Sequence, residues 1–105
     1  SIKMIDAGEI DTKLFAVFAD DPRFTAFQTI NDVPQHLKDE IQNFFLQYKA
    51  LQKKEVKING WGTLEEALEE IQECKERYTE YETRLLKGEK DAIMAEWKAK
   101  GLGQA

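Results

Sequence analysis

The sequence predicts an α+β fold. Short apolar stretches, alternating or nearly continuous, occupy the first 19 residues, whereas apolar residues recur at three- and four-residue spacing in most of the later chain. The first pattern favours strands and the second favours helices. The chain has 105 residues, which suffices for one domain but not for two. We therefore expect a small sheet with helices packed on it.

Two strands are predicted at the start of the chain. Residues 1–5 place Ile2 and Met4 on one face, and residues 13–19 form the apolar run KLFAVFA. A run of this kind is typical of a strand that is covered on both faces. The polar residues 6–12 between the strands are predicted to form a loop of seven residues. Residues 1–19 are thus expected to form a β-hairpin with an acidic turn.

A helix is predicted over residues 34–53, followed by a short strand and turn over 55–62. Asn31 or Asp32 can cap the helix, and Pro34 suits its first turn. Its apolar face is formed by Leu37, Ile41, Phe44, Phe45, Tyr48 and Leu51.

A second helix is predicted over residues 63–87, and a helical tail over 89–100. Thr63 and Glu66 have the spacing of a capping box at the start of the second helix. Gly88 separates the two helical segments. The expected inner face of the second helix is formed by Leu64, Leu68, Ile71, Cys74, Tyr78, Tyr81 and Leu85.

The charge and composition limit the classes of partner. The formal net charge is −5 at pH 7, and a basic patch of the kind that binds phosphate backbones is not evident, so no nucleic-acid partner is expected. No apolar stretch is long enough to span a membrane, so no membrane partner is expected. The single cysteine excludes an internal disulfide, which is typical of a reducing compartment. We therefore expect a cytoplasmic location.

Two groups of polar residues are candidates for a functional site. Asp6 and Asp11 flank the acidic turn, where carboxylates can bind a hard cation such as Mg²⁺. Lys13 lies two residues beyond Asp11, on the same strand face, and can reach an anion there. Tyr48 and Lys49 can both donate to a phosphate oxygen. From the residues alone, a solvated hairpin tip and a core tyrosine beside a surface lysine are favoured over a functional site.

Several segments together resemble a known family. DAGEIDTK at residues 6–13 resembles the metal-and-phosphate turn of the soluble family I inorganic pyrophosphatases. FFLQYK at 44–49 and KKEVKINGW at 53–61 follow in the order and at the spacing of the same family, and TLEEALEEIQEC resembles the family's next helix. The resemblance covers residues 1 to about 80.

The resemblance implies a reaction and roles for five residues. In that family pyrophosphate is hydrolysed to two orthophosphates by metal-assisted phosphoryl transfer. Asp6 and Asp11 would be Mg²⁺ ligands, and Lys13, Tyr48 and Lys49 would bind the substrate and act in catalysis. The family fold is a small, OB-like β-barrel, of which this chain would hold the last strands, packed with two to three C-terminal helices.

The chain also departs from the family. Ala7 stands where family members often carry a second acid. The upstream aspartate cluster of the family is not present, and ADDPRF at 19–24 lies on the wrong side of the turn. We therefore expect the C-terminal part of a pyrophosphatase, an incomplete domain that is inactive alone and that associates with the missing N-terminal half or with its own copies as a homo-oligomer. A non-catalytic Mg²⁺- and phosphate-binding module and a helical interaction fragment are the alternatives.

Overall fold

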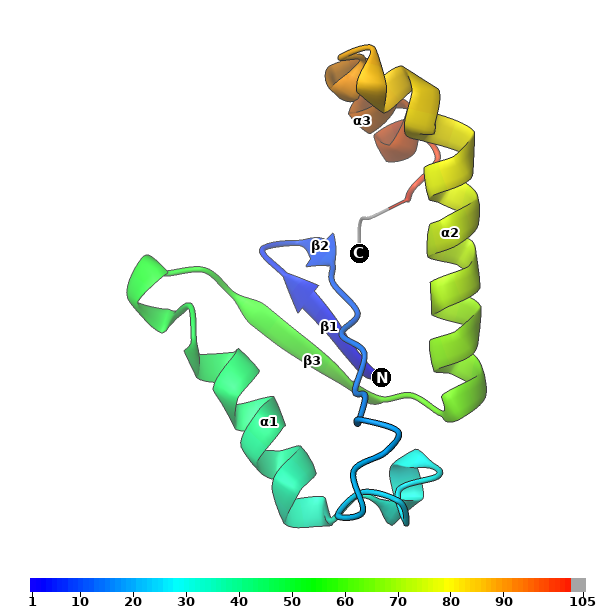
Figure 1. The fold of residues 1–105 in the computed structure, drawn as a ribbon. Helices are drawn as coiled ribbons and strands as arrows, with labels where there is room; N and C mark the ends of the chain where they lie inside the picture. Colours follow the sequence, from blue (N-terminus) through cyan, green and yellow to red (C-terminus); the bar gives the residue numbers. More distant parts are fainter. Residues whose placement is uncertain (103–105) are drawn as a thin grey trace.

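The structure, a computed structural model, describes residues 1–102 and combines a small sheet with three α-helices (Figure 1). The strands precede or separate the helices along the chain, and two short 3₁₀ turns lie in the connections. In chain order the elements are β1 (Ile2–Asp6), β2 (Glu9–Ile10), η1 (Ile30–Asp32), α1 (Gln35–Gln47), η2 (Ala50–Gln52), β3 (Val56–Trp61), α2 (Leu64–Leu86) and α3 (Lys90–Ala99).

The sheet has the strand order β2-β1-β3, and both pairings are antiparallel. On one side of β1, Ile5 pairs with Ile10. On the other side, β1 runs along β3 from the Ile2–Trp61 pair to the Asp6–Val56 pair. The central strand is therefore the first one in the chain, and it holds together segments that lie some 50 residues apart.

The loop between the first two strands is shorter than the sequence pattern predicts. Only Ala7 and Gly8 separate β1 from β2, and both have positive φ angles, of 51° and 83°. This is the backbone of a tight two-residue hairpin turn, whose twist matches that of the paired strands. The usual sequence signal for this turn is Asn-Gly or Asp-Gly. Because Ala7 stands in the first turn position, this signal is absent from the sequence.

The predicted strand over residues 13–19 is wrong for this structure. Lys13 forms an isolated bridge with Ile2, but the following residues join no ladder. A strand needs a neighbour for its backbone N–H and C=O groups, and the described chain offers none beyond Ile2. Phe18 is accordingly 83% exposed, although its apolar run predicts burial.

Helix α1 is shorter than the predicted 34–53. Pro34 occupies the N-cap position, while Asp32 instead accepts backbone hydrogen bonds from Gln28 and Thr29 within the preceding turn. The helix ends at Gln47, and the chain continues through η2 to Lys53, which has a φ of 55°. This left-handed residue turns the backbone away from the helix axis and into β3.

The buried part of the sheet faces α1. Ile2, Met4 and Asp6 alternate along β1 and are all buried, whereas Lys3 between them is exposed. Helices α1 and α2 lie on opposite sides of the sheet (Figure 1). The radius of gyration of 16.4 Å exceeds the value of about 13 Å expected for a compact domain of this length. The face toward α2 is thus open.

Helix α2 begins at the predicted position, because Thr63 accepts a hydrogen bond from the backbone of Glu66. Its predicted inner stripe, however, is largely uncovered: Leu68 is 57% exposed, Tyr78 is 57% exposed, and Cys74 is exposed. Only Tyr81 is buried, because α3 folds back against the end of α2 after a turn at Gly88.

None of the helices in residues 1–102 combines the length and the apolar character needed to cross a membrane.

Candidate functional site

The hairpin register brings three of the five candidate residues to one face of the sheet. The backbone N–H of Asp11 donates to the carbonyl of Met4 at 3.0 Å, and Lys13 is bridged to Ile2. Residues directly opposite each other in an antiparallel pair project to the same face. Asp11 and Lys13 therefore share the face of Met4 and Ile2, which is also the face of Asp6.

The other two candidates reach this face from the end of α1. Asp6 Oδ2 accepts a hydrogen bond from the Tyr48 hydroxyl at 3.0 Å, and it forms an ion pair with Lys49 Nζ. Asp6 is 8% exposed, and its partners lie 42 and 43 residues away in the sequence. A buried carboxylate is stable only when it is paired and hydrogen-bonded. The Asp6 contacts therefore join the sheet to α1.

These contacts shift the ionisation of both charged partners. The hydrogen bond from the Lys49 ammonium is the largest cause that lowers the pKa of Asp6, and the Tyr48 hydroxyl adds to it against partial burial. The same bond to Asp6 raises the pKa of Lys49. Asp6 is therefore a carboxylate and Lys49 an ammonium near neutral pH.

Asp11 and Lys13 form a second, more exposed pair. Lys13 Nζ lies 2.8 Å from Asp11 Oδ2, and the two side chains are 37% and 33% exposed. The Lys13 ammonium also lies 6.0 Å from the centre of the Phe45 ring on α1. The pair thus stands at the rim of the site, where solvent weakens its attraction.

A hollow of about 460 Å³ connects these groups. It is bordered by Asp6, Asp11 and Lys49. Lys13 and Tyr48 do not line it but contact the Asp11 and Asp6 carboxylates. Two further charged residues also line it, Glu9 and Lys54, which were not among the five residues expected from the sequence. The only sequence signal for Lys54 is the lysine pair at 53–54 immediately before β3.

The donor set fits a hard divalent cation. Asp6 Oδ1 is buried and has no hydrogen-bond partner among the described residues, so one carboxylate oxygen lacks a protein donor. Within residues 1–102, no group of three or more His, Cys, Asp or Glu side chains is arranged to hold a metal. Two carboxylates nevertheless suit Mg²⁺, which usually takes one or two from a protein and completes its shell with water and phosphate oxygens.

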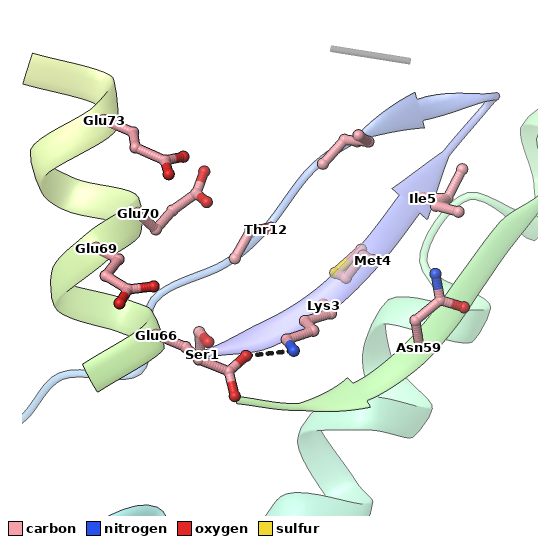
Figure 2. A pocket seen from close by; sticks show the side chains of 11 residues that line it. Ser1, Lys3, Met4, Ile5, Thr12, Asn59, Glu66, Glu69, Glu70 and Glu73 are labelled. Atoms are coloured by element: carbon pink, nitrogen blue, oxygen red, sulfur yellow. Dashed lines mark ion pairs between the residues drawn. The ribbon is translucent and has the colours of Figure 1, made fainter. Parts of the chain in front are cut away.

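A second hollow, of about 520 Å³, lies between the sheet and α2 (Figure 2). Glu66, Glu69, Glu70 and Glu73 project from α2 toward it, and Lys3 on β1 pairs with Glu66 across it. Its floor includes the apolar Ile5 and Ile10. This hollow opens on the side of the sheet opposite to Asp6, Tyr48 and Lys49, which together form the Asp6 cluster.

The fold and the cluster define an α+β protein with a carboxylate–lysine–tyrosine site. Carboxylates can bind a cation, and ammonium and hydroxyl groups can donate to an anion. This combination suits an anion that is recognised together with a cation.

Comparisons with known proteins agree with this class. The sequence profile of the inorganic pyrophosphatase family matches residues 1–79. The inorganic pyrophosphatase of Mycoplasma pneumoniae is 46% identical over 81 residues, which cover 77% of this chain and 44% of the relative. That of Geobacillus stearothermophilus is 46% identical over 79 residues, covering 75% and 48%. The crystal structure of the Thermus thermophilus inorganic pyrophosphatase superposes with a TM-score of 0.70 at 43% identity, covering 74% of this chain and 47% of that one.

The chain belongs to the inorganic pyrophosphatase family. It spans less than half the length of the curated relatives it matches. The matched part includes the whole Asp6 cluster and ends within α2, so the contact between the end of α2 and α3 lies beyond it.

Proposed function

We propose that this chain forms part of the active site of an inorganic pyrophosphatase, which in its complete form hydrolyses pyrophosphate to two orthophosphates by metal-assisted phosphoryl transfer. The observation that carries the proposal is the contact of Asp6 with Tyr48 and Lys49, next to a hollow that Asp6, Asp11 and Lys49 line. The family membership supports the same reaction.

In this proposal Asp6 and Asp11 hold Mg²⁺. Both border the hollow, and the free Oδ1 of Asp6 offers an oxygen ligand. Bound Mg²⁺ would supply neutralisation of the phosphate charge and Lewis-acid activation. Tyr48 keeps the Asp6 carboxylate in place through its hydroxyl, so that the free oxygen faces a fixed direction.

Lys13, Tyr48 and Lys49 bind the pyrophosphate and stabilise the charge that develops on its oxygens. All three are donors, and two of them carry a positive charge that is held close to the hollow by an aspartate. Charge-assisted hydrogen bonds to phosphate oxygens strengthen as negative charge accumulates during the reaction. These residues therefore favour the transition state over the bound substrate.

The proposal includes a completing segment. We infer that the sheet is part of a small OB-like barrel, that an N-terminal half of the same domain closes it, and that the described chain is inactive without that half. The open face of the sheet, the unpaired run after Lys13 and the exposed stripe on α2 support this inference. A homo-oligomer of the complete protein is also proposed, through those exposed apolar side chains that the N-terminal half leaves uncovered.

The test is a hybrid protein. The matched 79-residue segment of the Geobacillus stearothermophilus relative is replaced by residues 1–79 of this chain, and phosphate release from pyrophosphate is measured with and without Mg²⁺. We expect Mg²⁺-dependent hydrolysis by the hybrid and none by the 105-residue chain. A folded hybrid that releases no phosphate would refute the proposal.

A second candidate is binding of Mg²⁺ and phosphate without turnover. It is favoured by the small ligand set, since no group of three potential metal ligands occurs within residues 1–102. In a calorimetric titration the chain would then bind Mg²⁺ and pyrophosphate. A folded hybrid would bind both ligands as tightly as the chain does, and it would release no phosphate.

A further inference from the structure

The Asp6 carboxylate has two oxygens in very different surroundings. Oδ2 receives both the Tyr48 hydroxyl and the Lys49 ammonium, whereas Oδ1 is buried and has no hydrogen-bond partner among the described residues. A single carboxylate thus carries a positive partner on one side and a vacant acceptor on the other. A cation on Oδ1 would stand close to the Lys49 ammonium on Oδ2, with like charges facing each other across one carboxyl group.

The two donors on Oδ2 respond differently to such a cation. The Tyr48 hydroxyl is neutral, so its hydrogen bond to Asp6 persists when a cation arrives. The Lys49 ammonium is repelled, and its flexible four-carbon side chain allows it to swing away. Lys49 is 25% exposed and itself lines the hollow, so the released ammonium remains in the space where an anion would bind.

We propose that Lys49 is an exchangeable counter-charge: its ammonium neutralises Asp6 when no divalent cation is bound and turns to the phosphate oxygens of the substrate when a cation binds Asp6. This inference rests on the proposed function and adds a coupling between cation and anion binding. The cation must displace Lys49, which weakens its own binding. The anion then pairs with the displaced ammonium, and by linkage each ligand strengthens the binding of the other.

The structure provides a matched control for the charge of Lys49. Lys54 also lines the hollow, but it forms no ion pair with Asp6 among the described contacts. Lys54→Gln removes the same charge from the same hollow without freeing the carboxylate. Lys49→Arg keeps the charge and the pairing with Asp6. The difference between Lys49→Gln and Lys54→Gln therefore isolates displacement from general electrostatics.

The experiment is a calorimetric titration of MgCl₂ into the 105-residue chain and these variants, without and with inorganic phosphate. Without phosphate, Lys49→Gln should bind Mg²⁺ about two- to fivefold more tightly than Lys54→Gln, in line with the strength of partly exposed ion pairs. Lys49→Arg should match the unmodified chain. Phosphate should tighten Mg²⁺ binding in the unmodified chain and have less effect in Lys49→Gln.

A second measurement does not depend on a variant. In lysine side-chain NMR of the unmodified chain, the Lys49 ε-methylene resonance should shift with Mg²⁺ more than that of Lys54. Equal Mg²⁺ affinities of the two glutamine variants, tighter binding by Lys49→Arg, or absence of Mg²⁺ binding in all variants would overturn the inference. None of these results decides the proposed function, which depends on hydrolysis by the hybrid protein.

Discussion

Asp6 is a buried carboxylate whose position follows from the strand pattern and whose partners come from the end of α1. Its place in β1 alternates with Ile2 and Met4, so the strand period assigns it to the buried face. A carboxylate there requires partners, and the end of α1 supplies them as Tyr48 and Lys49. Tyr48 and Lys49 therefore stabilise the buried Asp6 carboxylate, in addition to their proposed contact with substrate.

Ala7 is the residue in the site with an unfavourable backbone. Its φ of 51° lies in the left-handed region, which costs a residue with a Cβ about 1–2 kcal/mol. Ala7→Gly should therefore stabilise the chain by about 0.5–1 kcal/mol, after the greater unfolded-state entropy of glycine is subtracted. Urea unfolding followed by circular dichroism, at one protein concentration, measures this change.

Ala16→Gly is the matched control for Ala7→Gly. Ala16 is also exposed but lies outside the positive-φ residues. The same substitution there should leave stability unchanged or lower it, because only the entropy of the unfolded chain changes in favour of unfolding. A gain of equal size at both positions would contradict the explanation by backbone conformation.

At the scale of elements, the contact between the ends of α2 and α3 is a small core of its own. The ring of Tyr81, which is 3% exposed, packs edge-on against Trp97 with a centroid distance of 5.4 Å. Arg84 binds the carboxylate of Glu96 at 2.7 Å, and Lys100 donates to the Tyr81 hydroxyl at 3.1 Å. This packing gives α3 a fixed place beyond the part of the chain that matches the family.

Ile93→Ala tests whether this small core stabilises α3. Ile93 is 1% exposed, so its truncation should destabilise the hairpin of α2 and α3 by about 2 kcal/mol or more through lost burial and a cavity. Met94→Ala is the control, because Met94 is 48% exposed, and surface changes usually stay within about 0.5 kcal/mol. Amide hydrogen exchange along α3 reports both effects, and equal protection in the two variants would contradict the packing.

Glu96 gives this hairpin a pH dependence. Its hydrogen bond with Arg84 lowers the pKa of Glu96 below the ordinary value of 4.5. The stabilisation is complete above that value and is lost as the pH falls through the lower, folded-state pKa. Glu96→Gln should therefore reduce amide protection in α3 at pH 7 and make little difference in strong acid. A loss of the same size at both pH values would contradict the ion pair.

Local sequence signals located α2 and α3, but they fixed neither the end of α1 nor the strands. The capping signal at Thr63 and the break at Gly88 locate α2 and α3 because these are local effects. The tight turn at Ala7 and the end of η2 at Lys53 depend on left-handed residues that carry a Cβ, for which sequence has no strong signal. The run after Lys13 could not be decided locally, since a strand depends on a partner elsewhere in the chain.

The sequence named five candidate residues for the site, but it indicated neither Glu9 and Lys54 nor the geometry. The resemblance singled out Asp6, Asp11, Lys13, Tyr48 and Lys49, and their roles remain proposals. Sequence spacing could not show that Lys49 pairs with Asp6 while Lys13 pairs with Asp11. The Lys49–Asp6 pair depends on where the end of α1 lies relative to the sheet.

At the scale of the whole molecule, the chain exposes more apolar surface than a small domain normally does. Leu68, Ile71 and Tyr78 lie exposed along α2, and Phe18 is exposed after the unpaired run. Large uncovered apolar surfaces mark interfaces or aggregation sites. Together with the extended shape, they support the proposal that a further protein segment covers this side of the molecule.

The isolated chain should therefore self-associate. Light scattering coupled to size exclusion should give a mass well above the 12.2 kDa of one chain. Leu68→Gln combined with Ile71→Gln should shift the mass toward the monomer, because it removes apolar area from the exposed face of α2. The control is Leu51→Gln, which changes a fully exposed leucine outside α2. A monomer that unfolds cooperatively at all concentrations would contradict this expectation.

The central claim is that the acidic hairpin forms part of a pyrophosphate-hydrolysing site. The most direct measurement is phosphate release by the hybrid protein carrying Asp11→Asn, compared with the hybrid carrying Asp20→Asn, whose carboxylate is exposed and lies outside the hollow. Asp11→Asn should lower turnover by about 100-fold or more, while Asp20→Asn should stay within about twofold. Equal turnover in the two hybrids would contradict the claim.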